Sequence, residues 1–246
     1  MEAQDRLGRI NPIIEWLKSS PNRINKIFIQ KERGPQRIGE IIRLAKSNNI
    51  PVVFVPKQRL DSLYSHHQGA VAFVAEKEYV QLEDLLLKDR PAFLVILDEV
   101  EDPQNLGAII RSAEGAGVDG IILPERRSAG LTSTVATVAA GALSHIQVAR
   151  VTNLARAIDW LKEQGVWVVG ATGEAQTKWY EFDFTQPVAI VLGSEGSGIR
   201  ASIKKKCDVL LSLPMQGKVS SLNVSAAAAV FFFEVVRQRL ISSEQK

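Results

Sequence analysis

The chain has 246 residues, 46% hydrophobic and 23% charged, a composition typical of a folded globular protein and not of a disordered one. Its one cysteine, Cys207, excludes an internal disulfide, and its three histidines lack metal-ligand spacing, so we expect no metal. The net charge of +3 is uneven, because residues 1–75 hold 12 Lys and Arg against 6 Asp and Glu, which fits a polyanionic partner and a solvated basic surface equally well.

The first twenty residues contain Asp5, Arg9 and Glu15 and lack the apolar core of a signal peptide. No apolar run along the chain approaches the ~18 residues of a membrane span. We therefore expect a cytoplasmic protein with no membrane partner.

Short apolar segments rich in β-branched residues alternate with segments of helical character. This alternation predicts an α/β fold of parallel sheets with helices on both faces, whose strands are buried on both sides. The expected strands are residues 26–30, 51–55, 70–75, 93–98, 120–124, 146–151, 166–172, 188–193 and 209–214. The expected helices are residues 10–19, 36–48, 104–116, 153–163 and 222–239.

A charged stretch that ends in proline, residues 76–91, lies between the first three strands and the rest. Such a stretch is typical of a connection between domains. We therefore expect a small basic α/β domain at 1–76, a linker at 77–92 and a larger domain at 93–246.

The segment DEVEDPQNLGAIIRSAEGAG (98–117) directly follows an expected strand. Pro103 and Asn105 mark a turn, and Asn105 can cap the helix that follows. Arg111 lies in that helix among apolar residues. A strand-to-helix connection with one snorkelling arginine would explain the pattern, but ligands of open α/β sheets bind beyond the carboxyl ends of the strands.

The segment VLGSEGSGIR (191–200) also ends a strand, and its glycines permit a tight turn or close backbone approach to a ligand. Its spacing is not the dinucleotide fingerprint, and no Walker lysine follows. The carboxylate of Glu195 argues against a phosphate cradle. A plain turn remains the alternative explanation.

The segment MQGKVSSLNVSAAAAVFFFE (215–234) places a polar cluster before a very apolar helix. Ser220 or Ser221 can cap that helix, but one cap does not account for Ser220, Ser221, Asn223 and Ser225 together. The helix is apolar nearly all round, so it must be covered by its own domain or by a second subunit.

These stretches resemble the three motifs of the SpoU (TrmH) family of RNA ribose 2′-O-methyltransferases, within the SPOUT class. The motifs are DPQNLGAIIRS (102–112), LGSEGSG (192–198) and LPMQGKVSSLNVS (213–225), in which Leu213 replaces the usual isoleucine. The resemblance covers residues 93–240.

The front of the chain resembles the family's substrate-binding domain, a small fold like ribosomal protein L30e. GRINPIIEWLKS (8–19) and HHQGAVAFV (66–74) carry this likeness, which favours the subgroup that modifies a guanosine ribose in large-subunit (23S) rRNA. Thr137 and Ala139 depart from the lysine and serine of the pattern.

The resemblance implies a deep trefoil knot at the C-terminal end, a fold that general rules make rare. It also implies structured RNA as substrate, a homodimer paired through the knot domain, and S-adenosylmethionine as cofactor. The residues that would hold the cofactor, carried over by motif, are Thr172, Gly173, Leu192, Gly193, Glu195, Leu213, Met215, Leu222 and Asn223.

The expected catalytic residues are Arg111, Asn105, Glu195, Ser221 and Asn223. A ribose hydroxyl is a poor nucleophile and must lose its proton, while oxygen and methyl carbon are held in line. The resemblance places Arg111 at this hydroxyl; because the pKa of an arginine normally lies far above neutral pH, Arg111 is expected to stabilise the developing alkoxide and bind the adjacent phosphate.

Asn105 would position Arg111 or the ribose, and Glu195 would orient the polar cluster. Ser221 and Asn223 would line the ribose and the cofactor. A tRNA ribose methyltransferase and an inactive RNA-binding homologue are the alternatives. A purely structural dimer would leave the three motifs unexplained.

Overall fold

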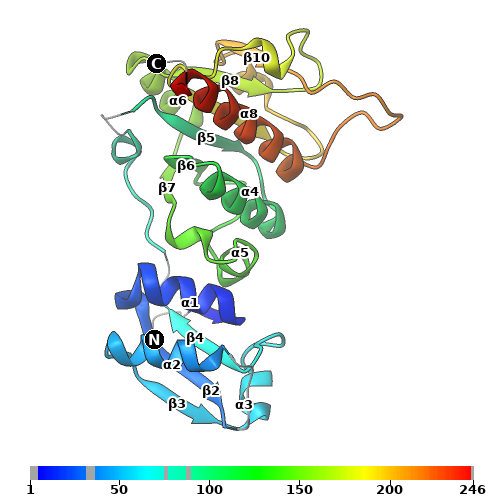
Figure 1. Cartoon of the computed structure of the whole chain (residues 1–246). Helices are drawn as coiled ribbons and strands as arrows, with labels where there is room; N and C mark the ends of the chain where they lie inside the picture. The colour runs from blue at the N-terminus through cyan, green and yellow to red at the C-terminus, as the bar shows by residue number, and fades with distance from the viewer. Residues whose placement is uncertain (1–4, 32–36, 75–76, 87–89, 245–246) are drawn as a thin grey trace. The chain divides into compact units, whose positions relative to one another are not determined.

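The computed structural model describes residues 5–31, 37–74, 77–86 and 90–244 (Figure 1). Three expected segments extend beyond these ranges: residue 36 of one helix, residue 75 of one strand and residues 87–89 of the linker lie outside them. The chain forms two compact units. Unit 1 comprises Met1–Glu78 with Gly130–His145, and unit 2 comprises Tyr79–Ala129 with Ile146–Lys246.

Unit 1 is built on a four-stranded sheet in the order β1-β4-β2-β3. The β2/β3 pair is parallel, but β4 runs antiparallel to both β1 and β2, so the expected parallel arrangement is wrong for this sheet. Apolar patterning records burial and does not record strand direction. The elements are β1 (Asp5–Gly8), α1 (Ile10–Ser19), β2 (Ile24–Gln30), α2 (Ile38–Ser47), β3 (Val52–Val55), α3 (Lys57–Asp61), β4 (Ala70–Val74) and α5 (Ser133–Val138).

The histidine-glutamine-glycine stretch organises a turn within unit 1. His67 is buried, its Nδ1 accepts a hydrogen bond from the Gly69 amide at 2.8 Å, and its Nε2 lies 3.0 Å from Asp61 Oδ1. Gln68 adopts a left-handed conformation with φ 48°, and its side-chain oxygen accepts from the Ile10 amide at the start of α1. The stretch therefore holds the turn before β4 against the start of α1.

The segment Gly130–His145 belongs to unit 1, where α5 packs against β1. Thr137, which departs from the family's lysine, is buried and its hydroxyl lies 2.8 Å from the Tyr64 hydroxyl. The same hydroxyl donates to the Ser133 carbonyl. In this chain, position 137 therefore has a packing role inside the unit.

Unit 2 is built on a six-stranded sheet in the order β10-β8-β9-β5-β6-β7, with every pair parallel as expected. β5 and β9 lie at its centre and are buried along their whole length. The elements are β5 (Phe93–Asp98), α4 (Pro103–Gly115), β6 (Gly120–Pro124), β7 (Gln147–Val151), α6 (Leu154–Glu163), β8 (Trp167–Ala171), β9 (Val188–Gly193), α7 (Ala201–Lys204), β10 (Val209–Leu211) and α8 (Val224–Glu244).

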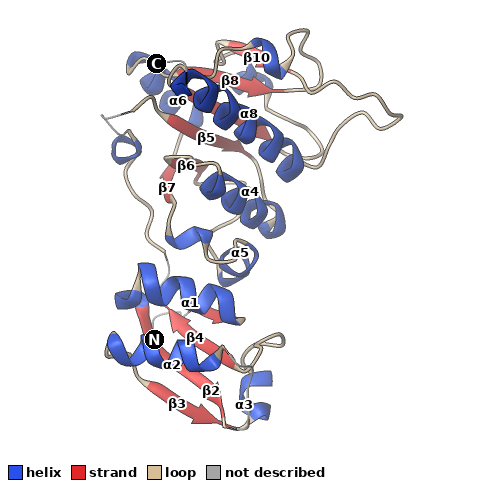
Figure 2. Cartoon of the chain, viewed as in Figure 1, coloured by secondary structure: helices blue, strands red, loops and turns tan. Residues whose placement is uncertain are grey.

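Helices cover both faces of this sheet (Figure 2). On one face, Leu154, Ile158 and Leu161 of α6 join the core cluster that contains Leu94 and Ile96 of β5. The spacing of these α6 residues is that of one apolar helix face. On the other face, α8 lies beside α4 and its Phe232 ring packs edge-on against Phe93 of β5.

Two expected helix caps are corrected by the structure. α4 is capped by Asp102, whose side chain accepts from the Gln104 amide, because Pro103 occupies the first helical position where proline is favoured. Asn105 therefore lies inside α4. α8 begins at Val224, and its cap is Asn223 instead of a serine.

Candidate active site

The three motif stretches meet at one edge of the unit 2 sheet. DPQNLGAIIRS follows β5, LGSEGSG begins with the last two residues of β9, and LPMQGKVSSLNVS connects β10 to α8. β5 and β9 are parallel neighbours, so their carboxyl ends bring the first two stretches side by side. The third stretch reaches them because α8 packs beside α4.

Asn223 joins all three stretches through its side chain. Its amide nitrogen donates to Asn105 Oδ1 at 2.9 Å and also to Glu195 Oε1. Its oxygen accepts from the Ser225 amide at 2.9 Å, which caps α8. Because Asn105 is buried, these bonds fix the relative positions of the amide and the Glu195 carboxylate. Asn223 is therefore both the cap of α8 and the residue that joins the polar side chains of the three stretches.

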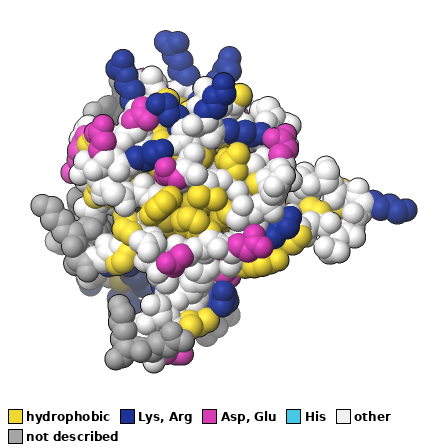
Figure 3. Space-filling model, turned by 90° about the horizontal axis from the view of Figure 1, so that it is seen from above, with side chains coloured by type: hydrophobic (Ala, Val, Ile, Leu, Met, Phe, Trp, Pro, Cys, Tyr) yellow, Lys and Arg dark blue, Asp and Glu magenta, His cyan; other side chains and the backbone are white. Residues whose placement is uncertain are grey.

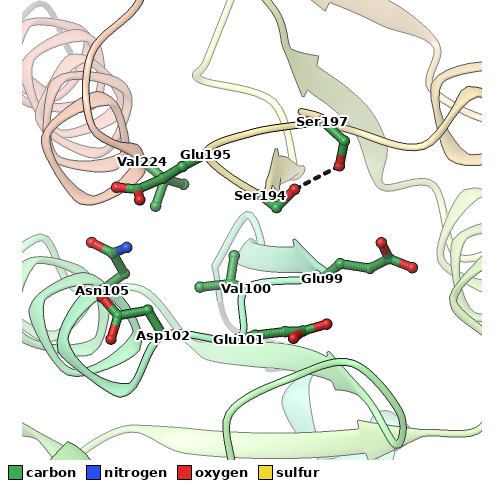
Figure 4. A pocket seen from close by; sticks show the side chains of 9 residues that line it. All are labelled: Glu99, Val100, Glu101, Asp102, Asn105, Ser194, Glu195, Ser197 and Val224. Atoms are coloured by element: carbon green, nitrogen blue, oxygen red, sulfur yellow. Dashed lines mark hydrogen bonds between the residues drawn. The ribbon is translucent and has the colours of Figure 1, made fainter.

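A pocket of about 350 Å³ opens beside this cluster (Figure 4). In Figure 4, Glu195 and Asn105 extend toward the same space from different elements, and Ser194 and Ser197 are joined by a 2.7 Å hydrogen bond. The pocket is rich in carboxylates. Its lining residues are Glu99, Val100, Glu101, Asp102, Asn105, Ser194, Glu195, Ser197 and Val224.

A second cavity, of about 520 Å³, shares Ser194, Glu195, Ser197 and Val224 with this pocket. The two spaces therefore lie side by side and share a wall. The larger cavity is lined by eight of the nine residues expected to hold the cofactor, and by Ser221; Asn223 is not among its lining residues. These eight are Thr172, Gly173, Leu192, Gly193, Glu195, Leu213, Met215 and Leu222.

The backbone of the LGSEGSG stretch is folded too tightly for a side chain at its start. A Cβ atom at Gly193 would lie 2.0 Å from the Gly198 carbonyl carbon, which is a severe clash with backbone. The stretch turns back on itself through a bridge between Ser194 and Gly198, and Gly198 has φ 65°. Gly193 is therefore required to bring this loop against the cavity.

A buried ion pair anchors the end of the same loop. Asp98, fully buried at the end of β5, accepts from the Arg200 backbone amide at 2.9 Å and from its Nε at 2.8 Å. The carboxylate raises the pKa of the Arg200 guanidinium above its usual value. This pair, which sequence reasoning missed, holds the loop after β9 to the strand that precedes Asn105.

Arg111 is placed differently from the other expected catalytic residues. It is exposed on α4 and lines neither the pocket nor the cavity of the single chain. Six helical positions separate it from Asn105, about 9 Å along the helix axis and about a third of a turn round it. Ser221 is also exposed; it lines the cavity but not the pocket.

The pocket also contains carboxylates that were not among the expected catalytic or cofactor-binding residues. Glu99, Glu101 and Asp102 belong to the acidic run DEVED, which begins at Asp98, the last residue of β5. A polar run at the carboxyl end of a buried strand could have signalled them. Glu99 is unusual because its backbone has φ 62°, a conformation rare for residues other than glycine.

Within the described residues, no group of three or more His, Cys, Asp or Glu is arranged to hold a metal ion. The described helices include none that is long and apolar enough to cross a membrane.

Comparison with known protein families matches both parts of the chain. Residues 92–233 match the SpoU rRNA Methylase family, and residues 10–80 match the family described as RNA 2′-O ribose methyltransferase substrate binding. The first match covers every residue of the pocket and the cavity.

The relatives of this chain match it over nearly their whole length. YacO of Bacillus subtilis (strain 168), named in the TrmH family of tRNA/rRNA methyltransferases, is 45% identical over 93% of this chain and 94% of its own. The 23S rRNA (guanosine-2′-O-)-methyltransferase RlmB of Coxiella burnetii is 45% identical over 94% of each chain. The structure of the SpoU methyltransferase AviRb from Streptomyces viridochromogenes has the same fold, with a TM-score of 0.83 at 23% identity over 96% of this chain and 91% of that one.

Proposed function

The chain belongs to the SpoU rRNA methylase family, and from this premise we propose that it methylates the ribose 2′-hydroxyl of a guanosine in 23S rRNA. The observation that carries the proposal is the contact of Asn223 with Asn105 and Glu195, which joins the three motifs where pocket and cavity meet. The match of RlmB proteins over almost the full length, N-terminal unit included, supports the rRNA substrate.

The cavity fits S-adenosylmethionine as cofactor. Its volume of about 520 Å³ lies within the range of small-molecule sites, and its walls combine apolar side chains such as Leu192 and Leu213 with backbone polar groups. Gly193 and Gly198 also line the cavity, and glycine has no side chain to keep a ligand from its backbone groups. When bound, S-adenosylmethionine supplies an activated methyl carbon for in-line displacement.

In this proposal the smaller pocket receives the ribose. The shared wall of Ser194, Glu195, Ser197 and Val224 brings its hydroxyl next to the cofactor cavity. Asn105 and Glu195, fixed through Asn223, orient the ribose, while Ser221 lines the cofactor side. The ribose oxygen would bond to the methyl carbon as the sulfur–methyl bond breaks, the sulfur leaving as a neutral thioether and the hydroxyl proton passing to solvent, and no metal is required for this displacement.

We propose that the enzyme is a homodimer paired through α8. Val230, Phe233, Leu240 and Ile241 are between 39% and 58% exposed on this helix, at a spacing that places them on one face. Figure 3 shows hydrophobic side chains gathered on the face seen from above. A second copy of α8 is the self-complementary cover that such a face requires.

The dimer gives Arg111 its role. α4, which carries Arg111, packs beside α8, so a dimer formed through α8 places this exposed arginine next to the subunit boundary. There its guanidinium stabilises the developing alkoxide and binds the neighbouring RNA phosphate.

The remaining features of the proposal follow from the family. Residues 1–76 form the proposed L30e-like RNA substrate-binding domain, 77–92 the linker, and 93–246 the methyltransferase domain with its C-terminal trefoil knot; within this last range, Gly130–His145 belongs to unit 1. With rRNA as the proposed substrate, we propose a cytoplasmic location for the enzyme. Structured RNA is its partner in the reaction.

Mapping of 2′-O-methyl groups on RNA from cells with and without the gene tests this function. We expect one guanosine of 23S rRNA to lose its 2′-O-methyl group on deletion, and the purified protein with S-adenosylmethionine to restore it on unmodified rRNA. Loss of methylation on tRNA alone would favour the tRNA ribose methyltransferase. No change in either RNA, and no methyl transfer by the purified protein, would favour an inactive RNA-binding homologue.

A further inference from the structure

A second polar hollow in unit 2 lies next to the ribose pocket. It has a volume of about 800 Å³ and is lined at the carboxyl ends of β6 and β7 by Arg126, Arg127 and Asn153. Arg200 and Glu99 complete the side nearest the ribose pocket, and Glu99 lines both spaces. A strand of RNA that placed one ribose in the pocket would therefore have its adjoining backbone at the mouth of this hollow.

The loop that carries Arg126 and Arg127 is anchored at both ends. The Glu125 amide donates to the Val151 carbonyl at 2.9 Å, and the Ala129 amide donates to the Val100 carbonyl at 3.0 Å. The two arginines thus stand on a short loop whose flanks are bonded to β7 and to the segment after β5. Such anchoring lowers the entropic cost of binding a ligand.

Two ion pairs at the hollow each join a carboxylate that is buried or nearly so to a guanidinium group that is more exposed. The Asp98 side chain is fully buried and that of Glu99 is 15% exposed, whereas their partners Arg200 and Arg127 are 40% and 70% exposed. An approaching polyanion therefore meets Arg127 and Arg200 before it meets Glu99 and Asp98. The acids are neutralised by these ion pairs, at 3.1 Å for Arg127 with Glu99 and 2.6 Å for Arg200 with Asp98.

The Glu99–Arg127 pair joins two residues with unusual backbones. Glu99 has φ 62° and Arg127 has φ 56°, both in the left-handed region that favours glycine. Conformations of this kind persist where the surrounding structure holds them, and they occur often at functional sites. Here they direct the two side chains to each other at the boundary between the ribose pocket and the hollow.

Arg126 provides a cation without a carboxylate partner. It is exposed, and within the described residues it makes no hydrogen bond or ion pair. Glu125 also lines the hollow and is exposed, so the hollow is not uniformly positive. A phosphate group would give Arg126 the bidentate partner that its fork geometry suits.

We propose that this hollow binds a backbone phosphodiester of the substrate RNA beside the methylated nucleotide, with Arg126 and Arg127 as its phosphate-binding residues. The inference rests on the proposed RNA substrate, and it adds to that proposal the path that the RNA backbone takes across unit 2. Contacts of this kind position the nucleotide without reading its base.

The test uses the full-length protein, a transcript of the rRNA region that the wild type methylates, and S-adenosylmethionine. Arg126→Gln, Arg127→Gln and the double variant are compared with Lys205→Gln, which removes an equal charge from an exposed position of unit 2 outside the hollow. We expect the KM for RNA to rise about 3- to 10-fold for each arginine, with kcat within twofold of the wild-type value. The slope of log affinity against log salt should fall by about one per arginine.

Cofactor affinity, measured by calorimetry, should stay at the wild-type value in all these variants. An RNA KM and a salt slope in the double variant equal to those of Lys205→Gln would overturn the inference, as would a fall in kcat alone. Arg126→Gln settles the matter if Arg127 variants unfold, because Arg126 has no partner in the described part of the chain to lose. A wild-type protein that methylates no RNA would instead reject the proposed function itself.

Discussion

The side-chain amide nitrogen of Asn223 lies 2.9 Å from Oδ1 of Asn105, a residue 118 positions earlier in the chain. The same nitrogen bonds Glu195, while the Asn223 oxygen caps α8. Helix capping and site assembly therefore use opposite ends of one amide. Substitutions can separate the two roles.

Asn223→Asp should abolish methylation with little loss of stability. Aspartate keeps the oxygen that caps α8, but it cannot donate to Asn105 and it places a second carboxylate against Glu195. Asn223→Ala should lose activity and also about 1 kcal/mol of stability through the missing cap. Methyl-transfer assays with denaturant unfolding measure both effects. Equal stability of the alanine and wild-type proteins would contradict the capping role.

Gly193→Ala should weaken cofactor binding more than tenfold. The added Cβ would lie 2.0 Å from the Gly198 carbonyl carbon, so the loop that lines the cofactor cavity must move. Gly196→Ala is the matched control, because a Cβ at that position meets nothing within 4 Å. Calorimetric titration with S-adenosylmethionine compares the two variants. Similar affinities would show that the loop tolerates the shift.

Arg111→Ala should reduce methylation to background while cofactor affinity by calorimetry stays near that of the wild type. Arg111 lies outside the cavity lining, so its removal leaves the cofactor contacts in place. Arg156→Ala removes an exposed helical arginine elsewhere in unit 2 and should retain activity. Lost cofactor binding in the Arg111 variant would refute the role given to this side chain.

Phe233→Glu together with Leu240→Glu should convert the homodimer to a monomer in analytical ultracentrifugation. Both side chains are more than half exposed on α8, and two charges there would have to be desolvated in the paired state. Val53→Glu changes an exposed apolar residue of unit 1 and should leave the dimer intact. A wild-type protein that sediments as a monomer at micromolar concentration would count against the proposed pairing.

The stability of unit 1 should rise with pH through the titration of Lys77. Burial, and secondarily the charge of Arg23, lowers the pKa of Lys77 to about 8 in the folded protein, below its value of 10.5 in an unfolded chain. Between these values the unfolded chain binds more protons, so raising the pH favours folding. The wild type should therefore gain stability relative to Lys77→Met between pH 8 and pH 10. Parallel pH profiles for the two proteins would show that Lys77 is equally protonated in both states.

The sequence by itself determined the α/β class, the strand–helix alternation that favours a parallel sheet in the larger unit, and the residue types of the three motifs. Periodicity records which side chains are buried, and a motif records which chemical groups lie close together along the chain. Both signals are local. They therefore located α1 and α6 to within a residue, and they identified Gly193, Glu195 and Asn223 as notable residues.

Only the tertiary structure decided which of these groups meet. The direction of β4 and the assignment of the α4 cap to Asp102 depend on hydrogen bonds that apolar patterning does not encode. The contact of Asn223 with Asn105 depends on the packing of α8 against α4, which no local signal contains. The hollow beside Arg126 likewise exists because β5, β6 and β7 end at the same edge of one sheet.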